Sequence, residues 1–597
     1  MGQHQSHKRQ RTEQQPPWQQ QQQHEQLDGA PDAASDDPSR IWLPDVVHHF
    51  ASFLGGNELA CTLRLVNKAT AAQFRGPQHT TIQLSLQVPC HAFAWRWGGP
   101  CATRSPTVRQ RRQLLCLTAR SGSIANLEVL LARDDLTSRL RTKAMEAAAG
   151  AGQLEVCRWL RQQGCPWNSD APDAAAGAGH KEVCEWLHAE GCPFGDDVVR
   201  RAAAKGRWAV CEWLLINICP ELVKYMEADA AVAAARSGHV GLMDWFLART
   251  AGTQRSLLAA AAAGCDLPTL QRLHHTYLDS RGEALSRGRQ GKVVKAAAGS
   301  PTADWRDKLE RLDGRGYPRN AHACRKAAQQ VDGRARLEWL QQRGFPITTA
   351  DVAIAAAEHS NADALEFLLA QGVQLGDDLA AAATRNAARR GHLAVLKVLR
   401  AHGARIDHSR VALAAYGGHL PVVAWLVEVL GAATALTAMV YADAARSGSA
   451  ELLAWLNEAG CPWDASVFAS AAISGSEEQL EWLVKRGCPM GDDGEPYRRA
   501  LENADLAVLR CLRRLGCPWG PVGLTFTSAI QAFKHSTASL RKQLLLALPW
   551  LVEQGCPFNW AAAEQEARER GDGEVTAWMG QLRPPSVVGC EREKCGR

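Results

Sequence analysis

The stretch from Val156 to Phe194 reads VCRWLRQQGCPW, then an interval rich in alanine and glycine, then VCEWLHAEGCPF. Trp159, Trp186 and Trp213 follow one another at steps of 27 residues, and cysteines at 165, 192 and 219 keep the same step. A fixed period in this range is the sequence signature of a stacked repeat protein. The stretch therefore predicts that one small unit recurs along the chain.

Each unit is predicted to be a pair of helices. Val156, Trp159 and Leu160 share one helical face because they are spaced i, i+3 and i+4. Gly164 is expected to end this helix, and Pro166 prevents it from resuming. An alanine-rich helix precedes it, and its small side chains allow a neighbouring helix to approach closely. Because one pair buries little apolar surface, the pairs must stack.

The apolar pattern of the second helix recurs sixteen times, so the sequence predicts a mainly α solenoid over residues 113–580. The instances lie near Leu127, Leu154, Val183, Val210, Leu242, Leu270, Leu309, Leu337, Leu365, Leu396, Val423, Leu453, Leu480, Leu509, Leu548 and Val575.

One of these units resembles an ankyrin repeat. Residues 386–407 read NAARRGHLAVLKVLRAHGARID, with the GH turn and the second-helix pattern of that family. Many units here are shorter than the 33 residues of an ankyrin repeat, and the TPLH opening is absent. The resemblance implies stacked helix pairs whose hairpin fingers are shortened or missing, so the contact positions of the family are not carried over.

A different pattern precedes the repeats. Residues 41–75 open with IWLPDVVHHFASFL and continue to LRLVNK, which predicts three short helices. The LPDVV and LRLVNK motifs resemble the F-box, a helical module that docks onto the adaptor subunit of cullin-type ubiquitin ligases. The resemblance implies that adaptor contacts, or the core that shapes them, come from Leu43, Pro44, Val47, Phe50, Leu54, Leu63 and Val66.

The same helices could instead be a cap that shields the first repeat, as solenoids require. A cap would turn its apolar stripe inward, whereas a docking module keeps part of that stripe exposed. The structure can distinguish these two alternatives.

The remaining segments complete the predicted organisation. Residues 1–38 are rich in glutamine and residues 581–597 are polar and broken by prolines, so both are predicted to be disordered. The F-box-like module is expected over 39–76. An irregular connector is expected over 77–112, with a possible strand at 81–88.

Three residue types recur inside the repeats, and each is predicted to have a structural role. The cysteines fit buried packing positions, because no zinc-type spacing occurs and a reducing compartment suits nineteen of them. The histidines of the GH turns are expected to form structural hydrogen bonds. The repeat core is expected to contain Trp159, Trp186, Trp213, Trp245, Trp339, Trp425, Trp455 and Trp482.

Residues 281–295, RGEALSRGRQGKVVK, carry five basic residues and are predicted to form an inserted basic loop. A solvated loop is the simpler reading, and contact with an acidic partner or nucleic acid is the alternative. The phosphate-loop motif is rejected, because Ser286 stands at its first glycine and Val293 at its final hydroxyl position.

No catalytic, metal or cofactor motif emerges, so we expect a protein that is not an enzyme. The net charge of +6 is mild for 597 residues, which does not favour nucleic acid, and neither a membrane span nor a secretory signal is expected. The expected location is the cytosol, the nucleus or both. The predicted function is substrate recruitment for a cullin-type ligase, with the repeats holding a protein substrate. The alternative is a repeat scaffold with no role in ubiquitin transfer.

Overall fold

The computed structural model describes residues 43–99, 101–133, 138–218, 223–250, 256–532, 538–569 and 573–582. The expected disordered tail 1–38 and Cys219 lie outside these described residues, as does the expected C-terminal tail beyond residue 582, whereas residues 581–582 end a helix. The chain divides into two compact units, Met1–Thr81 and Ile82–Arg597. Each unit is described by itself below.

The first unit consists of short helices, as the sequence predicted. They are α1 (Pro44–Ala51), α2 (Gly56–Cys61), the 3-10 turn η3 (Leu63–Leu65), α3 (Lys68–Gln73) and α4 (Pro77–Thr80). Pro44 occupies the start of α1, where its missing N–H costs nothing. Asn67 caps α3 by accepting a hydrogen bond from the Thr70 N–H at 2.8 Å.

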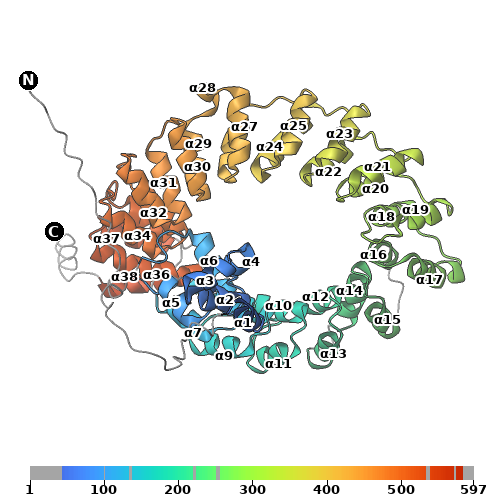
Figure 1. Cartoon of the computed structure of the whole chain (residues 1–597), viewed down its shortest axis with the longest axis horizontal. Coiled ribbons are helices and arrows are strands. Elements are labelled where there is room, and N and C mark those ends of the chain that lie inside the picture. Colours follow the sequence, from blue (N-terminus) through green and yellow to red (C-terminus); the bar gives the residue numbers. More distant parts are fainter. Residues whose placement is uncertain are drawn as a thin grey trace, which may run out of the picture. The chain divides into compact units, whose positions relative to one another are not determined.

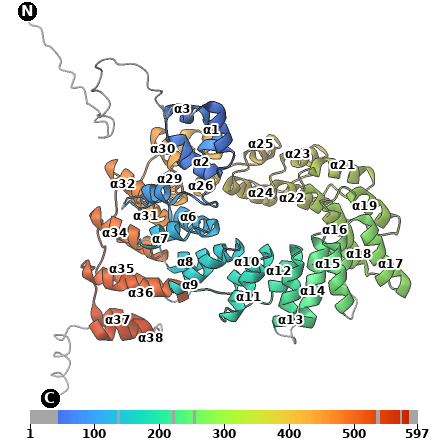
Figure 2. The ribbon, with the colours of Figure 1, turned by 60° about the horizontal axis from the view of Figure 1, so that its bottom comes forward.

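The described residues of the second unit form sixteen successive helix pairs, and all sixteen predicted positions lie in second helices. A short helix, α5 (Cys90–Trp97), precedes the pairs, and α28 (Ala432–Ala435) and the 3-10 turn η4 (Asp279–Arg281) lie between them. Figures 1 and 2 show the first helices side by side in one row and the second helices in another. The chain is therefore a mainly α repeat protein.

The first helices are α6 (Val108–Ser121), α8 (Ser138–Gly150), α10 (Asp170–Ala178), α12 (Val198–Ala204), α14 (Val223–Arg236), α16 (Leu257–Gly264), α18 (Arg287–Ala298), α20 (Ala321–Ala328), α22 (Ala350–Glu358), α24 (Asp377–Arg390), α26 (Ser409–Tyr416), α29 (Ala438–Ser447), α31 (Ala465–Ser474), α33 (Glu495–Glu502), α35 (Leu524–Ala532) and α37 (Trp560–Glu569).

The second helices are α7 (Ile124–Leu131), α9 (Leu154–Gln162), α11 (Lys181–Ala189), α13 (Trp208–Asn217), α15 (Val240–Arg249), α17 (Leu267–Tyr277), α19 (Trp305–Asp313), α21 (Gly333–Gln342), α23 (Ala362–Ala370), α25 (Leu393–Ala401), α27 (Leu420–Leu430), α30 (Ala450–Glu458), α32 (Glu477–Lys485), α34 (Leu506–Arg514), α36 (Ala538–Glu553) and α38 (Gly573–Leu582).

A tight glycine turn joins the two helices of a typical pair. Gly179 has φ of 97°, a left-handed conformation that glycine adopts without strain, and the His180 N–H closes the turn on the Ala175 carbonyl at 3.0 Å. The histidine that follows such a glycine reaches back to the preceding pair, because His419 Nε2 lies 3.1 Å from the Arg389 carbonyl oxygen. The predicted structural role of these histidines is confirmed at this position.

The core between pairs is made of alanines from the first helices and aliphatic and cysteine side chains from the second helices. In the pair of α10 and α11, Ala175, Ala176, Val183, Cys184 and Leu187 are all buried. The described cysteines are free thiols, and those of the repeats are largely buried. They pack as small apolar residues, as predicted.

Two expectations about irregular segments are wrong. Residues 81–88 form no strand, because no neighbouring strand is available among the described residues to pair with them. The basic stretch is not an inserted loop, since residues 287–298 form α18, a regular first helix that packs between α16 and α20. Its Val293, Val294, Ala297 and Ala298 are buried, and burial of this apolar face holds α18 in the row of first helices.

The second unit also contains contacts between its early and late helices. Arg111 on α6 forms a buried ion pair with Asp505, and its guanidinium donates to the Gly475 carbonyl at 3.1 Å. We call this set the closing contact. Nearby, Arg104 pairs with Glu477 and Glu481 on α32. Since α6 also packs against α8, the chain of helix contacts returns to its beginning.

Of the helices in the described ranges, none has the length and apolar character to cross a membrane.

Candidate functional site

The N-terminal unit has a small core made by only one side of α1. Val47 and Ala51 are buried with Leu59 and Phe74, and Leu54 and Leu63 pack against them while half-buried. The ring of Phe74 also meets the ring of His48 edge to face, with centroids 5.2 Å apart. This core fixes how α1 is rotated against α2 and α3.

The other side of α1 carries a second apolar stripe that remains exposed. Leu43, Val46, Phe50 and Phe53 are spaced i, i+3, i+7 and i+10, so they lie along one side of the helix and its continuation. Phe50 is 55% exposed and Phe53 is 74% exposed. The core of so small a module encloses only a few side chains, so these four remain in contact with solvent.

The end of η3 adds two more exposed apolar side chains, with Leu65 at 68% exposure and the following Val66 at 51%. We define the apolar face as Leu43, Val46, Phe50, Phe53, Leu65 and Val66. An exposed apolar stripe such as that of Leu43, Val46, Phe50 and Phe53 commonly marks an interaction site on a soluble protein. The apolar face is therefore the candidate docking surface.

The predicted contact residues divide between the core and this surface. Val47 is buried and Leu54 and Leu63 are half-buried, whereas Leu43, Pro44, Phe50 and Val66 are exposed. Sequence reasoning left Val46, Phe53 and Leu65 out of the contact set. The regular spacing of Val46 and Phe53 with Phe50 was the signal that could have found two of them.

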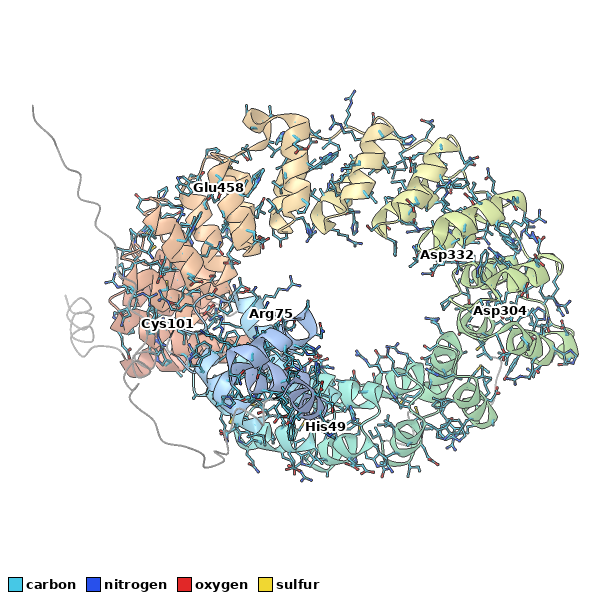
Figure 3. The ribbon with its side chains drawn as sticks, in the orientation of Figure 1. His49, Arg75, Cys101, Asp304, Asp332 and Glu458 are labelled. Carbon is cyan, nitrogen blue, oxygen red and sulfur yellow. The ribbon has the colours of Figure 1, made fainter. Side chains whose placement is uncertain are left out.

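Polar contacts hold the helices that present the apolar face. The Gln73 side-chain amide donates to the Pro44 carbonyl at 2.8 Å, which ties the end of α3 to the start of α1. His49 stacks edge to face on Phe53 with centroids 5.1 Å apart. Figure 3 labels His49 and Arg75, which lie on α1 and just after α3. The exposed rings thus stand on a braced scaffold.

The eight predicted core tryptophans lie at the margin of the repeat core. Trp159, Trp186, Trp213, Trp245, Trp339, Trp425, Trp455 and Trp482 are all half-buried, and the residue that follows each of them is buried. The aromatic residue of a GCP loop contacts the tryptophan of the next pair, as Trp167 does with Trp186 at a centroid distance of 5.9 Å. Arg161 in turn covers Trp167, 3.9 Å from its ring centroid. The tryptophans therefore join neighbouring pairs along the row of second helices.

One group of side chains in the repeats could offer ligands to a metal ion, namely Glu477, Glu481 and Cys511. Both carboxylates already pair with Arg104 and Arg514. Burial raises the pKa of the Cys511 thiol to about 12, which disfavours the thiolate that a metal needs. We therefore assign Glu477 and Glu481 to an ion-pair network and not to a metal site.

The comparisons with known proteins reach solved structures only. No protein-family model matches the chain, and no curated protein matches it. The chain is similar to the pentatricopeptide repeat protein PPR10 in complex with an 18-nucleotide psaJ RNA element, at 12% identity, covering 92% of this chain and 88% of that chain, with a TM-score of 0.24. PPR10 from maize matches at 12% identity over 90% and 97% of the two chains, with a TM-score of 0.19. A likeness at these values carries no argument about what this chain binds.

Proposed function

We propose that this protein is a non-catalytic interaction protein with two binding regions. The N-terminal unit docks a protein partner through the apolar face, and the repeat unit binds a second protein. The proposal that the N-terminal unit docks a partner rests on the exposure of Leu43, Val46, Phe50 and Phe53. A helical cap would have turned this stripe toward the repeats.

The finer proposal is that the docked partner is the adaptor subunit of a cullin-type ubiquitin ligase, so that the repeats hold a substrate. It is supported by the resemblance of LPDVV and LRLVNK to the F-box together with the exposed stripe. Aromatic and aliphatic anchors of this kind dominate binding energy when they enter a partner's pocket. The alternative, a repeat scaffold without a ligase role, keeps the repeat interaction and loses the adaptor.

The proposal retains the cytosol or nucleus as the location. Free, buried thiols throughout the repeats support a reducing compartment, where thiols stay unpaired.

The test is a pull-down of the full chain from cell extract, read by mass spectrometry. The test variant is Phe50→Ser/Phe53→Ser, and the matched control is Val331→Ser/Met439→Ser, which also removes two exposed apolar side chains, from the repeat unit. We expect the intact chain and the control to recover an adaptor and a cullin, and the test variant to lose both. All three should retain their helical circular dichroism spectrum.

Two other outcomes would contradict the proposal in different ways. If all three proteins recover other partners equally and none recovers an adaptor, the ligase role is rejected and the repeat scaffold is supported. Recovery of the adaptor by the test variant at the level of the control would show that the apolar face is not the docking surface.

A further inference from the structure

The repeat unit contains a hollow of about 900 Å³ over four successive first helices, α14, α16, α18 and α20. Five basic side chains line it: Arg236, Arg289, Lys292, Lys295 and Lys326. They come from three different helices, and no acidic residue of the described chain joins them in the lining. The basic hollow, defined by these five residues, is a concave surface of one charge.

Three of the four first helices around the basic hollow, α16, α18 and α20, carry no acidic residue, whereas α14 carries Glu227 and Asp229. The sequences of α16 (Leu257–Gly264), α18 (Arg287–Ala298) and α20 (Ala321–Ala328) contain no aspartate or glutamate. Helix α18 by itself contributes four basic residues. The whole chain has a net charge of only +6. Positive charge is therefore concentrated here on a chain that is nearly balanced elsewhere.

The second helices of the same repeats have the opposite arrangement, because their charges are paired. Asp304 accepts from Lys308 at 3.3 Å and Asp332 from Arg336 at 2.7 Å, and Figure 3 labels both aspartates at the starts of α19 and α21. Arg319 pairs with Asp313 at 2.7 Å. These three aspartates are thus engaged in ion pairs with residues that do not line the hollow.

The cations of the hollow lack such partners. Arg236, Arg289, Lys292 and Lys295 form no ion pair within the part of the chain that the structure describes, and Lys326 donates only to the neutral Gln329 side chain, at 2.8 Å. Uncompensated like charges in a concave surface repel one another and raise the local potential. Such a surface is stabilised when an anion occupies it.

The floor of the hollow is made of small residues. Ala259, Ala263, Ala296 and Gly299 lie between the cations. The aliphatic stem of Lys326 crosses Gly299 at a place where a Cβ would clash with its Cγ. The small floor lets an elongated ligand approach the helices closely while the longer basic side chains reach its charges.

The dimensions indicate an extended chain as the occupant. Packed helices lie about 8–10 Å apart, so four in a row span about 24–30 Å. An extended peptide covers that length with about seven to nine residues. No aromatic residue lines the hollow within the described ranges, so it offers no platform on which the bases of a single-stranded nucleic acid could stack.

We propose that the basic hollow binds an extended acidic segment of a protein partner, whose side-chain carboxylates or phosphates meet Arg236, Arg289, Lys292, Lys295 and Lys326. The inference rests on the proposed function, since it assigns the chemical class of the protein that the repeats hold.

The experiment is fluorescence anisotropy with the full chain and three labelled probes in about 0.1 M salt. The probes are a peptide of about nine residues alternating glutamate and serine, a peptide of the same length and net charge in which phosphoserines replace part of the glutamates, and a single-stranded RNA of similar charge. The test variant is Arg289→Gln/Lys292→Gln/Lys295→Gln. The matched control is Lys205→Gln/Lys397→Gln/Lys485→Gln, which removes three exposed cations outside the hollow.

We expect at least one peptide to bind the intact chain, the test variant to weaken binding about tenfold or more, and the control to stay within about twofold. Tighter binding of the charge-matched phosphorylated peptide would identify phosphate as the recognised group, and equal binding of the two peptides would show that carboxylates and phosphates are recognised alike. The proposal is overturned if neither peptide binds, if both variants weaken binding equally, or if RNA binds more tightly than both peptides. Because the assay contains no adaptor, these outcomes are independent of the pull-down of the N-terminal unit.

Discussion

The N-terminal unit and the repeat unit treat their large apolar side chains in opposite ways. In the repeats, the aliphatic residues on the inward face of a second helix are buried against neighbouring helices, as Leu187 of α11 is. In the N-terminal unit, α1 buries Val47 and Ala51 and leaves Phe50 and Phe53 in solvent. The difference teaches that stacking, and not composition, decides which apolar residues of this chain are available to a partner.

The largest expected contrast concerns the reactivity of thiols. Burial raises the pKa of Cys157, Cys184 and Cys211 to about 12 from the usual 9.0, which lowers the thiolate fraction at pH 8 about a thousandfold. Cys90 and Cys101 are exposed. Among the described cysteines, we expect iodoacetamide at pH 8 to modify these two first and the buried repeat thiols only after unfolding, as followed by peptide mass spectrometry. Early labelling of Cys184 in the folded protein would mean that the pairs open readily.

The next contrast is at the closing contact. Arg111→Met leaves the Asp505 carboxylate buried without its cation, so we expect the free energy of unfolding to fall by about 3–5 kcal/mol. Urea unfolding followed by circular dichroism measures it. The double variant Arg111→Met/Asp505→Asn removes both charges, keeps an acceptor for the Val508 N–H at the start of α34, and should restore most of the loss. A loss below about 1 kcal/mol in the single variant would show that the contact contributes little.

The smallest effects come from matched truncations in the two units. Leu187→Ala removes a fully buried side chain and is expected to cost about 2–5 kcal/mol of unfolding free energy. Phe50→Ala removes an exposed ring and should stay within about 0.5 kcal/mol. The same urea titration checks both. If Phe50→Ala were as costly as Leu187→Ala, the apolar face would belong to a core and the comparison between the units would fail.

Much of the repeat architecture could be predicted from the sequence, because it depends on local spacing. The step between Trp159 and Trp186, the glycine that follows many of the first helices and the apolar positions of the second helices are features of a few residues each. They specify a helix pair, and a helix pair with one apolar side must stack.

The candidate docking surface was predicted only in part, for a geometric reason. Val46, Val47, Phe50, Phe53 and Leu54 read as one apolar stripe at helical spacing. Each residue turns the helix by about 100°, so Val46 and Val47 point in different directions. Only the packing of α1 on Leu59 and Phe74 decides which of the two sides is buried.

The basic hollow and the closing contact escaped prediction because both join residues that are far apart in the chain. Arg236 and Lys326 lie 90 positions from each other, and Arg111 and Asp505 lie 394 positions apart. The basic residues of 287–295 were visible, but their neighbours become known only when α18 is placed in the row.

The closing contact has a consequence for how this repeat unit comes apart. A linear array of repeats frays from its two terminal units, because each of these has a neighbour on one side only. Here Arg111 supplies α6 with contacts to residues near α31 and α34, and α36 also packs against α8. Deleting the last helices would therefore also destabilise the first ones. Truncation at either end of the repeat unit should therefore lower the stability of both ends. Shorter versions of this chain would need new capping helices at both ends.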